Sequence, residues 1–350
     1  MPDLTAGPST VLVRIDTIPV FSLGGAMRRR EFIALLCAVM ASPSSAQGQQ
    51  TAKVRTVGFL YPGTAAAAPP RIAAFLAGLR TRGLREPDVE IVSRVTGGDA
   101  TLPVPMANDL AKRKVDLILA ISPAAIRAAR SATETIPIVA GDLESDPVDA
   151  GLIASVARPG GNITGTFLDF PEFGKKWLEA LKEALPQVKS VGVVWDPATG
   201  AMQLRAVETA AQNLKLKLET WEVRSPADLE KSVLSAKQRN VDALLFLSSP
   251  FIGANTKLLA DLTLAQRLPA ITLFTDFARD GGLMAYGPNL MAIFNQLGVQ
   301  AAKLLQGERA AELPIETPTK FEFVLNLRTA KTLGVNIPQS VLLRADEVIE

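Results

Sequence analysis

The chain has 350 residues, long enough for two domains; 48% of them are apolar and the formal net charge is only +2. This balance is typical of a globular protein and leaves no basic field that would attract nucleic acid. There is no histidine and one cysteine, Cys37, which excludes Ser-His-Asp and Cys-His catalysis and zinc sites built from these residues. We therefore expect no metal, no cofactor and no nucleic acid partner.

Residues 27–46 (MRRREFIALLCAVMASPSSA) have the layout of an export signal. A basic start is followed by an apolar core of about ten residues, too short to span a membrane, and by small residues typical of a cleavage site. Residues 29–33 (RREFI) also fit the twin-arginine pattern, and the alternative is an ordinary secretory signal with a rich basic region. Cys37 lies in the apolar core, without the small preceding residues of a lipoprotein signal. We expect a periplasmic protein that starts at Met27, so that residues 1–26 are an upstream extension.

After a polar tether, strand-like and helix-like segments alternate. The expected strands are residues 55–61, 88–95, 115–122 and 136–141. The expected helices lie around residues 72–79, 102–114, 126–133 and 148–157. Because repeated strand–helix–strand units require right-handed crossovers, we predict a parallel sheet here. Residues 163–170 are extended and are expected to cross to a second lobe.

The same alternation returns after an amphipathic helix at residues 173–185. The expected strands are residues 188–195, 216–223, 242–247 and 270–275. The expected helices are residues 201–213, a segment that begins at Ser225-Pro226, and residues 255–267, 290–306 and 328–334. Residues 281–289 and 313–326 are extended and are expected to cross between the lobes.

Two strands end in the same way. Residues 115–123 (VDLILAISP) and 241–250 (VDALLFLSSP) both run from an acidic residue through an apolar stretch to a serine and a proline. In such a pattern the serine caps the following helix and the proline is its first residue. Neighbouring segments repeat at similar offsets of roughly 125–135 residues, about the size of one domain.

We therefore predict an α/β protein of two similar Rossmann-like lobes with parallel sheets, joined by three crossings. The N-terminal lobe is expected to contain residues 54–165 plus 286–318. The C-terminal lobe is expected to contain residues 166–285 plus 319–350.

Several stretches resemble the substrate-binding component family of ABC transporters that includes tryptophan- and tyrosine-uptake proteins. They are residues 136–139 (IPIV), 146–147 (DP), 157–165 (ARPGGNITG), 281–290 (GGLMAYGPNL), 318–323 (PTKFEF), 326–334 and 342–348 (LLRADEV). The resemblance covers the whole mature chain and implies a type I periplasmic-binding fold. It also implies a monomer that presents a small molecule to an ABC permease in the inner membrane. One departure is Ser248-Ser249, where relatives often carry an acidic residue, so a ligand amine bound there would lose its counter-charge.

Candidate ligand-binding residues follow from the rule that parallel sheets bind ligands beyond the carboxyl ends of their strands. In the first lobe they are Tyr61, Thr64, Ser122, Glu144, Ser145 and Asp146. In the second lobe they are Trp195, Asp196, Ser248, Ser249, Thr275 and Asp276, with Tyr286 at the crossing.

Each candidate has a structural alternative. Ser122 and Ser249 would serve as plain helix caps, although the helix N-terminus behind Ser122 also suits a carboxylate. Asp146 either starts a helix or holds a ligand ammonium. The aromatic residues at strand ends either pack the lobes or form an apolar wall for the ligand.

The leading hypothesis is a non-enzymatic receptor that closes its two lobes on an amino-acid-like or carboxylate solute. The first alternative is an exported enzyme that uses Asp146, Asp196 or Asp276 as acid and base, although no catalytic motif supports it. The second is a sensory module that presents the ligand to a membrane receptor. A repressor of similar fold is excluded by the export signal and by the missing DNA-binding headpiece.

Overall fold

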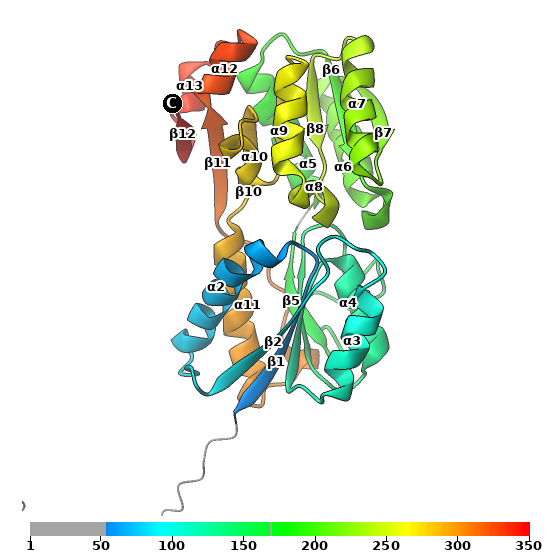
Figure 1. Cartoon of the computed structure of the whole chain (residues 1–350), viewed down its shortest axis with the longest axis vertical. Coiled ribbons are helices and arrows are strands. Elements are labelled where there is room, and N and C mark those ends of the chain that lie inside the picture. Colours follow the sequence, from blue (N-terminus) through cyan, green and yellow to red (C-terminus); the bar gives the residue numbers. More distant parts are fainter. Residues whose placement is uncertain (1–53, 169) are drawn as a thin grey trace, which may run out of the picture. The chain divides into compact units, whose positions relative to one another are not determined.

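The computed structural model describes residues 54–168 and 170–350, which form one compact unit. Two β-sheets, each covered by helices, make up this unit (Figure 1). Within the described residues, no helix combines the length and the apolarity that a membrane span requires. The predicted export signal and Cys37 lie outside the described residues.

The first sheet has five parallel strands in the order β2-β1-β3-β4-β5. They are β1 (Arg55–Tyr61), β2 (Val89–Val95), β3 (Leu117–Ile121), β4 (Ile138–Asp142) and β5 (Ile163–Phe167). Strand β3 is apolar throughout and β4 is apolar up to its last residue, Asp142, because both faces of the sheet are covered. In β3, Leu117 and Leu119 pack into one cluster of buried side chains, whereas Ile118 and Ala120 pack into the other.

Four longer helices cover this sheet. They are α2 (Ala68–Thr81), α3 (Pro103–Lys112), α4 (Pro123–Ala132) and α11 (Leu290–Leu305), with the short 3₁₀ helix η1 (Ala65–Ala67) before α2. Although α11 comes late in the sequence, it lies against α2 (Figure 1). The two helices approach closely at Gly78 and Gly298, where a Cβ atom on either glycine would lie 2.0 or 2.1 Å from a carbonyl oxygen of the other helix.

The second sheet has seven strands in the order β12-β11-β10-β9-β8-β6-β7. They are β6 (Ser190–Trp195), β7 (Lys217–Glu222), β8 (Ala243–Phe246), β9 (Ala270–Thr272), β10 (Met284–Pro288), β11 (Phe321–Asn326) and β12 (Glu347–Ile349). Only β11 runs antiparallel to its neighbour β10. The predicted α/β fold with two parallel-sheet lobes is therefore confirmed, with this one antiparallel pair added.

The helices of the second sheet follow the same alternation. They are α5 (Phe170–Ala184), α6 (Met202–Leu214), α7 (Pro226–Gln238), α8 (Pro250–Ala254), α9 (Thr256–Ala265), α10 (Thr275–Arg279), α12 (Leu327–Leu333) and α13 (Gln339–Leu342). Two 3₁₀ helices, η2 (Pro197–Thr199) and η3 (Ala310–Glu312), lie in connecting loops.

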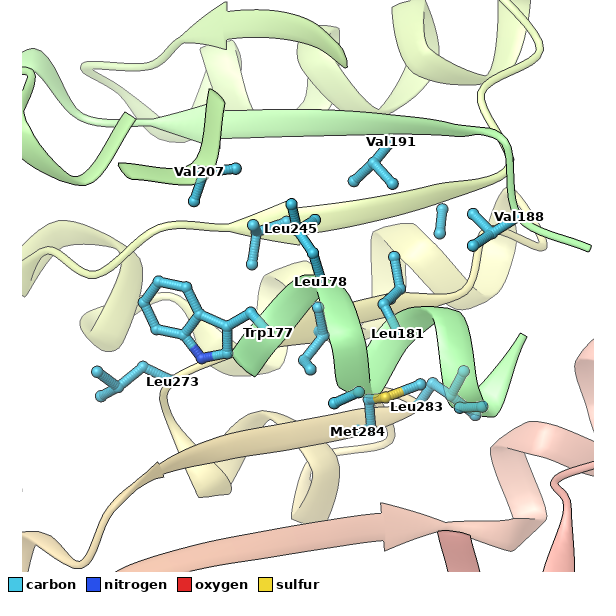
Figure 2. Close-up of a cluster of buried hydrophobic side chains, with 14 of the residues drawn as sticks. Trp177, Leu178, Leu181, Val188, Val191, Val207, Leu245, Leu273, Leu283 and Met284 are labelled. Carbon is cyan, nitrogen blue, oxygen red and sulfur yellow. The ribbon is translucent and has the colours of Figure 1, made fainter. Parts of the chain in front are cut away.

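The core of the second sheet is organised around Trp177 on α5. Its indole is fully buried and lies close to Leu178, Leu245 and Leu273 (Figure 2). The indole nitrogen donates a hydrogen bond of 2.7 Å to the carbonyl of Tyr286, so the apolar core also fixes strand β10.

Two sequence-based expectations about local structure are wrong. The sequence predicts a helix at residues 148–157, but only a single hydrogen-bonded turn is present. Gly151 adopts a left-handed φ of 64°, and this conformation ends the turn. The strand expected at residues 270–275 ends at Thr272, and Thr275 already begins helix α10. This early end places Asp276 in the first turn of a helix rather than at a strand end.

Candidate functional site

A cavity of about 300 Å³ lies beyond the carboxyl ends of β1, β3 and β4 and is also lined by residues that follow β8 and β9. Five predicted site residues line it: Tyr61, Thr64, Ser122, Glu144 and Asp276. The first four belong to the first sheet and its loops, whereas Asp276 belongs to α10 of the second sheet. The cavity therefore receives side chains from both lobes.

One wall of the cavity is aromatic. The Tyr61 ring stacks on Phe59 with 5.3 Å between the ring centroids and meets the edge of Phe294 at 6.5 Å. Phe274 of the second lobe also lines the cavity. Phe294 comes from α11, so the approach of α11 to α2 completes this wall. Such a surface favours a ligand with an apolar or aromatic portion.

A single cation, Arg71, lines the cavity among the described residues. Its guanidinium carbon lies 5.4 Å from the centroid of the Tyr61 ring, and its Nη1 donates a 2.7 Å hydrogen bond to the carbonyl of Ala67. Burial raises the pKa of the Tyr61 hydroxyl, the Arg71 charge opposes this rise and the Asp276 charge adds to it. Both charges therefore act on the same hydroxyl group.

Sequence reasoning missed Arg71 because it searched strand ends and Arg71 lies on a helix. A signal was available, since the positive N-terminal end of a helix dipole disfavours a cation in the first turn. Arg71 is the fourth residue of α2. A cation in that position indicates a role other than stabilising the helix.

Glu144 forms a buried hydrogen bond between the lobes. Its Oε1 accepts from the Ser248 hydroxyl at 2.9 Å, and its Oε2 accepts from the Leu143 N–H at 3.3 Å. Gln203 holds Ser248 in place by accepting from its N–H at 2.9 Å and donating to its carbonyl at 2.8 Å. A carboxyl group of the first lobe is thus hydrogen-bonded to Ser248 of the second lobe.

The electrostatics of this contact favour a protonated Glu144. Burial raises the pKa of its carboxyl group well above the usual value, and the neighbouring Asp142 charge raises it further. Asp142 accepts hydrogen bonds from the N–H groups of Glu144 and Ser145 at 2.7 and 3.0 Å, and from the Ser145 hydroxyl. These donors favour the charged form of Asp142, whose pKa burial nevertheless raises as well.

Ser122 and Ser249 both cap helices, as their patterns predict, but only Ser122 lines the cavity. The Ser122 hydroxyl accepts from the Ala125 N–H at a long 3.5 Å, whereas the Ser249 hydroxyl accepts from the Ile252 N–H at 3.0 Å. Ser122 also has a φ of 88° and a ψ of 155°, a backbone conformation that is unfavourable for residues other than glycine. Ser249 has an ordinary extended conformation.

We expect Ser122→Gly to raise the free energy of unfolding by about 1 kcal/mol. Glycine would relieve backbone strain of roughly 1–3 kcal/mol. Loss of the serine cap costs only a few tenths of a kcal/mol, and the greater freedom of glycine in the unfolded chain costs a further part of the gain. Ser249→Gly is the matched control, because it loses the cap with no strain to relieve and should lower stability. Urea titrations of both variants check this, and a similar loss of stability in both would contradict it.

The other predicted residues lie outside this cavity. Ser145 donates to Asp142, Asp146 accepts from the N–H groups of Val148 and Asp149, and Thr275 accepts from Arg279. Asp196 caps η2 and lines a smaller hollow of about 90 Å³ that it shares with Ser122. Trp195 packs against the core of the second sheet, and the Tyr286 ring stacks on Phe173 at 5.4 Å. Ser248 and Ser249 make the hydrogen bonds described above.

Within residues 54–168 and 170–350, no group of three or more histidine, cysteine, aspartate or glutamate side chains is placed to hold a metal ion. The cavity instead combines one cation, one exposed carboxylate, one buried carboxyl group and an aromatic wall. Chemically, this set suits reversible binding of a small molecule that has opposite charges and an apolar part.

Comparisons with known proteins agree on one family. The family described as "ABC transporter substrate binding protein" matches residues 70–349. A tyrosine-binding protein of Clostridioides difficile is 25% identical over 264 residues, which cover 75% of each chain.

Two solved structures share the fold. A Streptococcus pneumoniae ABC domain in complex with L-Trp has a TM-score of 0.78 and 24% identity, covering 84% of this chain and 99% of that one. A conserved domain protein of Vibrio cholerae has a TM-score of 0.78 and 25% identity, covering 85% of this chain and 100% of that one.

Proposed function

Because the chain belongs to the ABC transporter substrate-binding protein family, we propose that it is the solute receptor of an ABC importer and binds an amino acid in the cavity described above. The observation that carries the proposal is the lining of the cavity. Arg71 and Asp276 offer opposite charges, and Tyr61, Phe274 and Phe294 offer an apolar wall. The relative named for tyrosine binding supports the same ligand class.

Residues of both lobes contribute to the proposed site. From the first lobe, Tyr61, Thr64, Ser122 and Glu144 line the cavity, and Asp276 does so from the second. A ligand that contacts both sets gains its full interactions only when the lobes are closed, so ligand binding favours the closed form. This closed form is what the permease would recognise.

The proposal includes export. This family is typically extracytoplasmic, and residues 27–46 have the layout of an export signal. We place the mature protein in the periplasm as a monomer, with residues 29–33 directing it to the twin-arginine route. The export signal lies outside the described residues, so its support comes from sequence alone.

A screen of the mature protein against the twenty L-amino acids tests the ligand class. A bound amino acid at a hundredfold excess over Kd should stabilise the folded protein by about 2.7 kcal/mol, which appears as a rise in melting temperature. Recovery of that amino acid unchanged after incubation supports a receptor. No thermal shift with any amino acid, or conversion of the amino acid to a product, would contradict the proposal.

A further inference from the structure

We propose that Arg71 binds the carboxylate of an aromatic amino acid and that Asp276 binds its ammonium group, while the ligand side chain lies against Tyr61 and Phe294. This inference rests on the proposed function and assigns the orientation of the ligand within the same cavity. The strand-end rule indicated Asp276 as a candidate but not Arg71, and the structure places Arg71 on α2 and Asp276 on α10.

Arg71 has the donors that a carboxylate needs. It is half-buried, and the 2.7 Å hydrogen bond from Nη1 to Ala67 uses only one of its five N–H groups. No other hydrogen bond or ion pair of this side chain is present in the described part of the chain. The guanidinium also lies over the Tyr61 ring, and a planar guanidinium can bind a carboxylate through two parallel hydrogen bonds.

Asp276 supplies the opposite charge from the second lobe. Its side chain is 63% exposed and lines the cavity. Arg279 contacts its Oδ1 at 3.3 Å but is held mainly by Glu347, whose Oε2 lies 2.7 Å from Nη2. Asp276 therefore keeps acceptor capacity for a ligand ammonium.

Arg71 lies over the Tyr61 ring, and Asp276 lines the same cavity from the second lobe. Glu144 also lines the cavity, but its Oε1 already accepts from the Ser248 hydroxyl, and burial raises the pKa of its carboxyl group, which disfavours the charged form. A zwitterionic head group near Tyr61 would leave the ligand side chain among Phe294, Ile293 and Leu297. The volume of about 300 Å³ is at the lower end of typical ligand pockets and fits one amino acid.

Calorimetric titration with L-tryptophan, L-tyrosine and L-phenylalanine tests the assignment in the parent protein and two variants. Arg71→Gln should weaken binding by about ten- to hundredfold, since a hydrogen-bonded ion pair is lost. It should leave binding of tryptamine, which lacks the carboxylate, nearly unchanged. Asp276→Asn should weaken binding of the amino acids and of tryptamine, but not of 3-indolepropionate, which lacks the ammonium.

Matched controls separate these roles from effects on folding. The controls are Arg80→Gln and Asp261→Asn. Arg80 lies on the same helix as Arg71, Asp261 is an exposed carboxylate of the second lobe, and neither residue lines the cavity. Both variants should therefore bind the amino acids with the affinity of the parent protein. Arg71→Lys keeps the charge and should recover part of the affinity. If tryptamine binds too weakly to titrate, the affinity of Arg71→Lys for the amino acids tests the role of the Arg71 charge instead.

Four outcomes would overturn the inference. Three concern the variants: unchanged amino-acid affinity in Arg71→Gln, an equal loss for L-tryptophan and tryptamine in that variant, and no recovery in Arg71→Lys. The fourth is failure of the parent protein to bind any of the three aromatic amino acids. The proposed function would still stand if another of the twenty amino acids bound, so the two failures are distinguishable.

Discussion

Gly298→Ala is expected to lower the free energy of unfolding by about 3 kcal/mol, because the new methyl group has no space. A Cβ atom at this position would lie 2.1 Å from the carbonyl oxygen of Phe75 and 3.0 Å from the Cα atom of Gly78, both on α2. Both obstacles belong to the backbone, so no side-chain rotation can relieve the clash. Helices α2 and α11 would have to separate.

The separation should also weaken ligand binding, since α2 carries Arg71 and α11 carries Phe294. Urea denaturation measures the stability, and Gly161→Ala is the matched control. A Cβ atom at Gly161 meets no other atom within 4 Å, so its effect should stay within about 0.5 kcal/mol. A similarly small effect of Gly298→Ala would contradict the close helix contact.

Glu144→Gln is expected to stabilise the protein at pH 8 and to flatten its dependence on pH. The folded state raises the pKa of the Glu144 carboxyl group, mainly through burial and then through the Asp142 charge. Between the ordinary value near 4.5 and the raised value, the folded protein therefore holds a proton that the unfolded chain has released. The stability that the parent has below pH 4.5 is consequently lost as the pH rises through this window.

The glutamine amide carries no charge at any pH, and its oxygen can still accept the Ser248 hydroxyl hydrogen bond. We expect a gain on the order of 1–3 kcal/mol at pH 8, comparable to the cost of an uncompensated buried polar group. Denaturation series at several pH values measure this. Glu134→Gln, at an exposed position, is the control and should follow the parent. If Glu144→Gln also followed the parent at every pH, the carboxyl group would not be protonated in the folded state.

Much of the fold could be predicted because its signals are local. Val115 to Pro123 contains an apolar run, a capping serine and a helix-starting proline, and the structure has β3 and α4 at this place. The helix predicted after Pro147 is absent, because Gly151 has a left-handed conformation that interrupts an otherwise helical sequence pattern. A glycine of this kind is hard to distinguish by sequence from one that a helix tolerates.

The site could be predicted only where it follows strand ends. Tyr61, Ser122 and Glu144 lie at the cavity because strand ends converge at one edge of a parallel sheet. Arg71 and Phe294 reach it from helices that are more than two hundred residues apart, and nothing local in the sequence predicts their meeting. The bond from Ser248 to Glu144 likewise joins residues separated by 104 positions.

The late position of α11 has a consequence for how the chain acquires its structure. Phe75 and Leu79 of α2 are buried in the same cluster as Leu297 and Ala301 of α11. During synthesis, every strand from β6 to β10 emerges before the helix that covers this apolar surface. The part of the second lobe from β6 to β10 can form its contacts early, whereas the first lobe must wait for a contact of long sequence separation, the kind that slows folding. Until residues 290–305 arrive, the N-terminal part of the protein carries an incomplete core and is the segment most in need of protection from aggregation.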